Sequence, residues 1–457
     1  MAADLVAGSK PLHLPSHVTA LPPQWVWHRL DEVCEGVFDC PHSTPKLVEV
    51  GPFVVRTQDI ITGVFRAEQA ACVSEETYKE RTSRVVPKRG DLLYSREGTY
   101  FGIAAEVPAA TRVCLGQRMV LIRPKPSLVD FRFLCRWLNS PTMAAHIGGY
   151  RDGSVAERLN LPTIRALPVL VPPLGEQEEI AQVLGAFDDK IELNRRMSET
   201  LEAIARALFK SWFVDFDPVR AKAEGRDPGL PKPIADLLPD SLEDSELGEI
   251  PKGWEVGRFG AAVEQLREQD NPLSSPEALF DHFSMPAFDD ARSPKTERGE
   301  GIKSLKWRVP AGVVLLSKLN PEIERVWLVD VRPGERSVCS TEFLVLSARS
   351  PFTRSFVYCF ARSPLFRQQI EGLVTGTSKS HQRAQVDSIL SLSMVAPPSP
   401  IIEAFYRSAE ILLARALECR REASALGAAR DALLPELVSG RLRLGSRSRV
   451  LQICNAS

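Results

Sequence analysis

Few residues of this 457-residue chain have the types and spacing that a catalytic or metal site requires. His13 and His17 are four residues apart, as paired metal ligands on a helix are, but they lie in a proline-containing stretch and we expect them to bind nothing. The sequence contains no GxxxxGK phosphate-binding loop, no HExxH or GxSxG motif, no paired Cys/His spacing and no methyltransferase motif of the Asn-Pro-Pro-Tyr type. The pattern therefore favours a binding protein that is not itself an enzyme and holds no cofactor or metal.

The charge that could bind a partner is unevenly distributed. The whole chain has a formal net charge of −1, but residues 81–170 hold fourteen Lys/Arg against six Asp/Glu, and residues 301–390 hold thirteen against seven. Two basic faces are what a reader of two DNA sites needs, because backbone phosphates supply most of the binding affinity. The alternative is that each excess is an ordinary solvated surface.

Composition indicates an ordinary intracellular protein of two to four domains. Hydrophobic residues make up 44% and charged residues 25%, and no apolar run reaches membrane-spanning length. The beginning of the chain lacks the apolar core of a signal peptide. Nine cysteines, an odd number without a CxxC pair, favour reduced thiols and a cytoplasmic location.

An internal repeat organises the chain. LPPQWVWHRL at 21–30 aligns with IPKGWEVGRF at 250–259, so that Trp25 meets Trp254. Three further matches follow in the same order, at 86–96 with 309–318, at 131–141 with 354–364, and at Gly153 with Gly376. Each repeat then reaches a diproline, at 172–173 and at 397–398. Matches that recur in one order predict two copies of a small α/β globule, each followed by a long helix.

The first long helix is predicted over 176–213, roughly 57 Å at 1.5 Å per residue. Apart from the gap between Ile191 and Met197, its apolar residues are spaced three and four apart and form one stripe: Ile180, Leu184, Phe187, Ile191, Met197, Leu201, Ile204, Leu208 and Trp212. Asn194 falls on the same seam, where a polar residue can determine register at some cost in stability. So narrow a stripe requires a partner helix; the alternative is one core helix of a globular domain.

The second long helix, over 401–438, is the predicted partner. Its stripe has the same rhythm, skips a turn near Arg430 and has Pro435 close to its end: Ile402, Phe405, Ala409, Leu412, Ala416, Cys419, Ala423, Leu426, Leu433 and Leu437. Between the first helix and the second globule, residues 215–251 contain six prolines and an acidic end, which predicts an exposed linker. The alternative for part of this stretch is an ordered loop packed on the surface.

Three stretches resemble one protein family. Residues 172–219, with the Pro-Leu-acidic/Gln start, Phe187-Asp188 and Asn194, resemble the central conserved region of specificity subunits of type I restriction–modification enzymes. LGAARDALLPELVSGRLRL at 426–444 is similar to the family's C-terminal signature, and residues 39–63 are similar to the opening of its target-recognition domains. The second helix departs from the first, since PPSPIIEAFYRSAE stands where the first has PPLGEQEEIAQVLG.

The resemblance implies an α/β fold of two similar globular target-recognition domains separated by two long antiparallel coiled-coil helices, an internal pseudo-two-fold repeat. The expected parts are a tail at 1–20, a first target-recognition domain at 21–171, a long helix at 172–216, an acidic linker at 217–249, a second target-recognition domain at 250–396, a long helix at 397–440 and a tail at 441–457. Each recognition domain would read one half of a split double-stranded DNA site, and the helices would set the spacing of the halves.

The resemblance also implies partners. Such a subunit has no catalysis of its own; it recruits two methyltransferase (modification) subunits, which carry S-adenosylmethionine and flip the target adenine, and restriction/translocase subunits that use ATP and Mg. A different class of function stays open, namely a scaffold that binds other proteins through two globules and a coiled coil, without DNA specificity. A basic face on both globules favours DNA over the scaffold.

The candidate DNA-contacting residues are polar or basic and lie in loops that match the family's recognition domains: His42, Ser43, Thr44, Lys46, Arg56, Arg96, Arg151 and Ser154 in the first, and Lys303, Lys306, Lys318, Thr377, Lys379 and His381 in the second. Arg and Lys can bond guanine, and the alternatives are that they contact only phosphate or solvent. Glu176, Gln177, Asp188 and Asn194 are candidates for helix or modification-subunit contacts, against surface solvation or a helix N-terminal charge.

Overall fold

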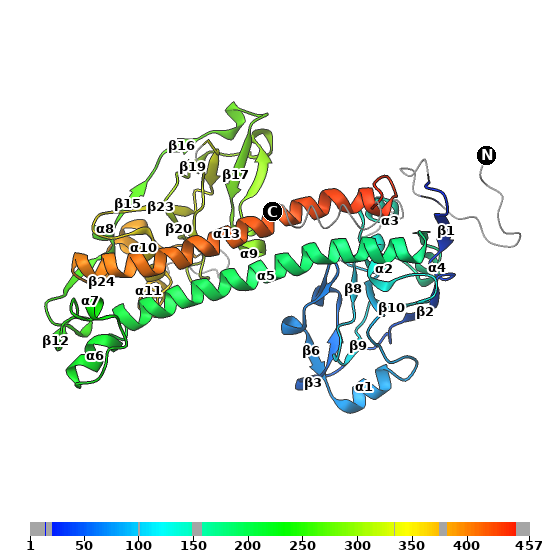
Figure 1. The fold of residues 1–457 in the computed structure, drawn as a ribbon, viewed down its shortest axis with the longest axis horizontal. Coiled ribbons are helices and arrows are strands. Elements are labelled where there is room, and N and C mark those ends of the chain that lie inside the picture. The colour runs from blue at the N-terminus through cyan, green and yellow to red at the C-terminus, as the bar shows by residue number, and fades with distance from the viewer. Residues whose placement is uncertain are drawn as a thin grey trace, which may run out of the picture. The chain divides into compact units, whose positions relative to one another are not determined.

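A computed structural model describes Leu14 and residues 21–98, 101–148, 158–332, 334–373 and 382–444 (Figure 1). The chain divides into two compact units: the first comprises residues 1–190 and 426–457, and the second residues 191–425. Both units mix strands and helices, which confirms the α/β prediction. Each unit also takes part of both long helices, so neither is a continuous stretch of sequence.

The first unit contains one four-stranded sheet, one three-stranded sheet and shorter pairs. Its strands are β1 (Val26–Arg29), β2 (Cys34–Asp39), β3 (Leu47–Val55), β4 (Ile60–Ile61), β5 (Val64–Phe65), β6 (Ala71–Val73), β7 (Leu92–Ser95), β8 (Ala104–Glu106), β9 (Val113–Leu115), β10 (Met119–Pro124) and β11 (Pro168–Val171). Its helices are α1 (Glu75–Arg81), α2 (Phe131–Leu138), α3 (Pro141–Gly148) and α4 (Leu161–Arg165). The four-stranded sheet has the order β2-β10-β7-β8, and β3 lies between β6 and β9, parallel to β9.

The second unit has more elements than the first. Its strands are β12 (Leu242–Ser245), β13 (Gly248–Pro251), β14 (Glu255–Arg258), β15 (Val263–Leu266), β16 (Gln269–Asp270), β17 (Leu279–Phe283), β18 (Lys295–Arg298), β19 (Lys306–Arg308), β20 (Val314–Ser317), β21 (Val326–Leu328), β22 (Ser337–Cys339), β23 (Phe343–Ala348) and β24 (Ser393–Ala396). Its helices are α6 (Asp217–Ala223), α7 (Lys232–Ala235), α8 (Phe259–Ala262), α9 (Met285–Ala291), α10 (Arg354–Ala361), α11 (Pro364–Glu371) and α12 (Val386–Leu390).

The topology repeats. The sheet β15-β23-β20-β21 has the connectivity of β2-β10-β7-β8, and β17 pairs in parallel with β22 as β3 does with β9. The aligned openings form equivalent antiparallel pairs, β1 with β11 and β14 with β24. Trp25 and Trp254 are both buried, and each donates its backbone N–H to the carbonyl of the proline three residues earlier. The predicted internal repeat is confirmed.

Local sequence explains why equivalent helices begin where they do. The Asp130 side chain accepts hydrogen bonds from the backbone N–H groups of Arg132 and Phe133 at the start of α2. In the second unit, Thr353 accepts one from Phe356 at the start of α10. Such N-caps bond N–H groups that have no partner within the helix. α2 and α10 then place their buried aromatic residues, among them Phe133 and Phe356, in the cores of their units.

The two long helices, α5 (Leu174–Phe213, green in Figure 1) and α13 (Ser399–Val438, orange to red), pack together within each unit. In the first unit, Leu184 of α5 shares a core with Leu437 of α13. In the second unit, Phe209 shares a core with Phe405, and their ring centroids are 5.6 Å apart. Because the beginning of α5 meets the end of α13 and the reverse also holds, the helices are antiparallel, as predicted.

The buried stripe of α5 differs from the prediction in its C-terminal half. Ile204, a predicted stripe residue, is 47% exposed. The buried positions lie one residue later than the predicted ones: Ser198, Glu202, Ala205 and Phe209 instead of Met197, Leu201, Ile204 and Leu208. Apolar spacing misplaced this face because buried positions of the helix carry polar side chains, including the predicted Asn194. On α13, every predicted stripe residue is buried or half-buried.

Residues 217–251 are ordered in the structure. They form α6, α7 and the antiparallel pair β12–β13, and Val219, Leu238 and Ile250 are buried in the main core of the second unit. The expectation of an exposed linker therefore gives way to the ordered alternative. Prolines begin or precede the short helices here, where the missing N–H costs no hydrogen bond, so a proline-rich composition is compatible with packed structure.

The eight cysteines within the described residues are all free thiols, and Cys454 lies outside them. Across the part of the chain that the structure describes, no helix is long and apolar enough to cross a membrane.

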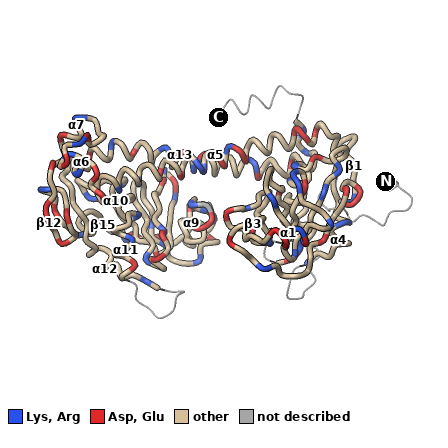
Figure 2. Tube along the Cα trace, turned by 90° about the horizontal axis from the view of Figure 1, so that it is seen from below, with Lys and Arg blue, Asp and Glu red and all other residues tan. Residues whose placement is uncertain are grey.

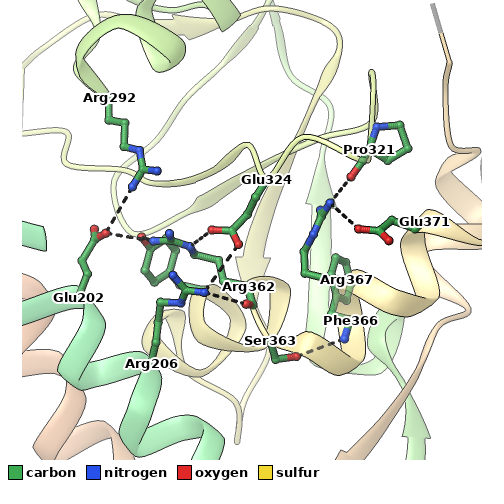
Figure 3. A network of polar contacts seen from close by, with 11 residues as sticks. Glu202, Arg206, Arg292, Pro321, Glu324, Arg362, Ser363, Phe366, Arg367 and Glu371 are labelled. Carbon is green, nitrogen blue, oxygen red and sulfur yellow. Dashed lines mark hydrogen bonds and ion pairs between the residues drawn. The ribbon is translucent and has the colours of Figure 1, made fainter. Parts of the chain in front are cut away.

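A buried ion-pair network explains how α5 tolerates Glu202 in the core (Figure 3). Its carboxylate is 4% exposed and accepts a hydrogen bond of 3.0 Å from Arg362, the residue directly after α10, and Arg420 of α13 bonds its other oxygen. Arg292 lies 3.9 Å away, and Arg362 also pairs with Glu324. Burial alone would raise the pKa of Glu202, but the charges of Arg420 and Arg362 outweigh burial and hold that pKa below its usual value.

We predict that Glu202→Ala lowers the free energy of unfolding of the second unit by about 3–5 kcal/mol, because it removes the carboxylate that the buried Arg362 and the half-buried Arg420 share. Denaturant unfolding of the full chain measures the loss. The matched control is Glu199→Ala, one helical turn away and exposed, where losing the pair with Arg195 should cost at most about 0.5 kcal/mol. Equal losses in the two variants would show that the network contributes nothing.

The ion-pair network around Glu202 also makes the stability of the fold depend on pH. Since the folded pKa of Glu202 lies below its unfolded value near 4.5, its contribution to stability is complete above that value and is lost as the pH falls through the lower, folded pKa. Acid unfolding of the wild type should therefore be steeper than that of Glu202→Gln in this range.

Candidate nucleic-acid interface

The loop between β2 and β3 presents four of the candidate residues. His42, Ser43, Thr44 and Lys46 are all exposed. The loop is nevertheless held in place, because Arg81 at the end of α1 donates to the carbonyl oxygens of Pro41 and Ser43, and Gln117 donates to that of His42. The structure therefore shows an exposed polar loop with a supported backbone.

Arg96 is not on the surface. Its side chain is 5% exposed and pairs with Asp39 at the end of β2, at 3.1 Å. His42 lies 3.6 Å from the same carboxylate. The structure thus brings the candidates Arg96 and His42 together around Asp39, but a direct DNA contact by Arg96 is not supported, because the guanidinium is covered. Sequence reasoning missed Asp39, the residue that joins them.

Arg56 is half-buried and forms an ion pair with a neighbouring carboxylate. Its Nε and one terminal nitrogen donate to the two oxygens of the buried Asp59, at 2.9 and 2.8 Å. These hydrogen bonds raise the pKa of Arg56. A bidentate pair is the geometry in which arginine holds a carboxylate most firmly. Arg56 therefore has only its remaining terminal nitrogen to offer a ligand.

In the second unit the candidates occupy two places. Lys318 directly follows β20, as Arg96 follows β7, and its side chain is half-buried. Lys303 is exposed, whereas Lys306 on β19 is half-buried, and burial lowers the pKa of Lys306. The repeat extends to backbone bonding, since Arg96 N–H donates to Arg118 and Lys318 N–H donates to Glu342, both at 3.0 Å.

Five candidates lie outside the described residues: Arg151, Ser154, Thr377, Lys379 and His381. The described residues that follow them are anchored alike. Leu159 donates its N–H to the Arg96 carbonyl at 2.9 Å, and Ala384 donates to the Lys318 carbonyl at 3.0 Å. Leu159 and Ala384 are therefore bonded at the ends of equivalent strands, β7 and β20.

Ion pairs account for much of the basic excess. Acidic residues from outside the two basic stretches pair with arginines inside them: Asp39 with Arg96, Glu75 with Arg112 and Asp188 with Arg136 in residues 81–170, and Asp289 with Arg325, Glu410 with Arg354 and Glu202 with Arg362 in residues 301–390. Figure 2 shows Lys/Arg and Asp/Glu interspersed along the elements. The count of charges therefore overstates the positive surface, and the contribution to DNA binding rests on fewer cations than the sequence suggests.

Two of the four subunit-contact candidates join α5 to its own unit. Glu176 accepts a hydrogen bond from Trp25 Nε1 at 3.2 Å and another from Arg443 at 2.6 Å. Asp188 pairs with Arg136 and, at 2.7 Å, with Arg430 of α13. Both carboxylates are partly exposed, so contacts within the first unit are their observed role and a partner contact stays a prediction.

The other two candidates are buried. Gln177 is fully covered: it accepts from the Asp130 N–H at 2.9 Å and donates to the carbonyl oxygens of Leu128 and Pro172. Gln177 therefore makes a helix contact, one of the roles expected of it, by fastening the start of α5 to the start of α2, and the alternative of surface solvation is wrong for this residue. Asn194 is also fully buried, and its amide bonds no described residue.

Among the described residues, no group of three or more His, Cys, Asp or Glu side chains is placed to hold a metal ion. The described features that could bind a ligand are loops with exposed hydrogen-bond donors and acceptors. Such an arrangement can bind an extended polar surface.

Comparison with known protein families matches residues 24–203 to the family described as "Type I restriction modification DNA specificity domain". The MjaIX type I restriction enzyme specificity subunit of Methanocaldococcus jannaschii is 27% identical over 381 residues, covering 81% of this chain and 82% of that protein. The HindI specificity subunit of Haemophilus influenzae is 24% identical, covering 78% and 87%.

Among solved structures, the S subunit of a type I restriction–modification system from M. genitalium aligns with a TM-score of 0.54 at 12% identity. The alignment covers 93% of this chain and 98% of that one. At this identity the likeness concerns the fold alone, and it agrees with the duplicated α/β architecture described above.

We predict that Asn194→Leu raises the free energy of unfolding by about 1–2 kcal/mol, because it replaces a buried amide that bonds no described residue with an apolar side chain of similar size. Thermal unfolding of the full chain measures the change. Thr200→Leu, on the exposed surface of the same helix, is the control and should change stability by less than about 0.5 kcal/mol. Destabilisation by Asn194→Leu would indicate that the amide has a bonding partner.

Proposed function

Because the chain belongs to the family of type I restriction–modification specificity subunits, we propose that it is the DNA-reading subunit of such a complex and is not itself catalytic. Its recognition domains, residues 21–171 and 250–396, each read one half of a bipartite double-stranded site. The observation that carries the proposal is the repeat: two sheets of identical connectivity, each with a polar loop region at the end of an equivalent strand. A scaffold for other proteins does not require this duplication.

Within each half, exposed loop residues make the contacts. In the first domain the exposed side chains of the 42–46 loop carry hydroxyl, imidazole and ammonium groups, which DNA-binding proteins use to bond bases or phosphates. In the second domain Lys303 is exposed, whereas Lys306 and Lys318 are half-buried. Phosphate contacts position the chain, and base contacts specify the sequence.

The antiparallel helices α5 and α13 set the spacing between the half-sites, by the general rule that protein geometry determines half-site separation. They also offer a surface for partners. Leu193 is 52% and Ile204 47% exposed on α5, and Ile411 is 72% exposed on α13. Exposed apolar residues on long helices favour further helices as partners, and we assign this surface to two modification subunits, with restriction/translocase subunits completing the complex.

In this proposal the modification and restriction subunits carry out the chemical reactions. S-adenosylmethionine is bound by the modification subunits, ATP and Mg by the restriction subunits, and none by this chain. The complex acts on DNA in the cytoplasm, in keeping with the free thiols of the described cysteines.

The test is to assemble the full chain with the methyltransferase subunits of its own system and to map methylated adenines in a host genome. We expect one split motif, with two short specific halves around a constant gap. Exchange of residues 21–171 for those of another family member should change one half only and leave the other half and the gap intact. Methylation at no defined motif by an assembled complex would exclude the DNA-reading role and leave the scaffold.

A further inference from the structure

Arg81 is a buried cation whose hydrogen bonds all go to uncharged groups. It is 7% exposed and donates to the carbonyl oxygen of Leu115 at 2.7 and 2.9 Å and to that of Ser43 at 3.0 Å. Among the described residues no carboxylate pairs with it. Leu115 ends β9 and Ser43 lies in the loop after β2, so one planar guanidinium joins two loops that are distant in sequence. A point charge such as lysine could not reach both carbonyl groups.

The second of these loops, residues 116–118 between β9 and β10, has a closely constrained backbone. Gly116 lies against β3, where an added Cβ would stand 2.5 Å from the Val55 carbonyl oxygen. Arg118 has a left-handed backbone with φ of 68°. Gln117 crosses to the other loop and donates to the His42 carbonyl. We call residues 41–46 and 116–118 the reading platform.

The platform presents free donors and acceptors to solvent. Gln117 and Arg118 are exposed, and the bond to His42 leaves Gln117 its amide oxygen and one N–H. The Arg118 side chain is 57% exposed, and its Nε lies 3.3 Å from the Glu97 carboxylate. Beside them lies a hollow of about 370 Å³, lined in part by Thr44, Arg56 and Thr57. An amide and a guanidinium with free faces are the groups that bond adenine and guanine edges.

The second unit has the same loop with different side chains. Residues 340–342 connect β22 to β23 as residues 116–118 connect β9 to β10, and the carbonyl groups of Arg118 and Glu342 accept equivalent backbone bonds. Where the first unit has Gly-Gln-Arg, the second has Ser-Thr-Glu. An equivalent position that carries different polar side chains is expected of a reader whose two halves recognise different bases.

We propose that Gln117 and Arg118 contact base edges of one half-site and determine its sequence, and that Arg81 is a positioning residue that holds the reading platform together from beneath. The inference rests on the proposed DNA-reading function and deepens it. The ligand is the base edges of double-stranded DNA, and the second unit uses residues 340–342 for the other half.

The test uses the full chain assembled with its modification subunits, with the methylated motif read by sequencing. Gln117→Ala and Arg118→Ala should each reduce discrimination at one or two adjacent base pairs of one half by roughly 5- to 100-fold, since a bidentate contact is lost. The other half should not change. Thr341→Ala and Glu342→Ala should relax that other half instead.

Arg81→Lys separates positioning from a general structural role. It keeps the charge and contacts no phosphate, so the dependence of DNA affinity on salt concentration should not change, while discrimination falls at the same base pairs as in Gln117→Ala. The matched control is Arg112→Ala, which removes an exposed arginine paired with Glu75 at the opposite end of β9 and should leave the motif intact. Thermal unfolding checks that each variant is folded.

The outcomes are distinguishable. A wild-type split motif that survives unchanged in Gln117→Ala, Arg118→Ala and Arg81→Lys overturns this inference and leaves the proposed function standing. Equal loss of both halves in Arg81→Lys assigns that residue a general structural role and overturns the positioning role. If the wild-type complex methylates no defined motif, both the proposed function and this inference are overturned.

Discussion

A forty-residue helix with one narrow buried face is stable only when another surface covers that face, and the rest of this structure depends on that constraint. α5 and α13 satisfy it for each other within each unit, through aliphatic contacts in the first and edge-to-face aromatic contacts such as Phe209 with Phe405 in the second. Within each unit the globule packs on its own part of the helix pair: Gln177 fastens α5 in the first unit, and Arg362 fastens it in the second.

Polar groups inside these interfaces are tolerated according to how well they are bonded. Glu202 is buried with two arginines around it, whereas Asn194 and Ser198 are buried without described partners. An ion pair of this kind makes one packing arrangement far better than its neighbours, since a shift of one residue along the helix would separate the charges. The polar face of α5 therefore favours one register over alternatives that apolar contacts alone would accept.

Arginine side chains in both units are likewise bonded mainly within the protein. Most arginines in the basic stretches hold carboxylates or carbonyl groups of their own unit, as Arg123 and Arg81 do. Gln117 and Arg118, which keep groups free for a ligand, lie on a loop that the buried Arg81 helps to hold. The few exposed side chains of this loop are thus placed by covered ones.

The sequence alone determined the repeat, the α/β class, the two antiparallel helices and the family, because turn residues, apolar spacing and motifs are local and recur in order. It could not determine which face of α5 is buried, since Glu202 becomes an interior residue only when Arg362 and Arg420 arrive from distant segments. Nor could it separate the exposed His42 from the covered Arg96, or find Arg81, Gln117 and Arg118. Burial and pairing depend on contacts across more than thirty residues of sequence, as between Arg81 and Leu115, and only the tertiary structure supplies them.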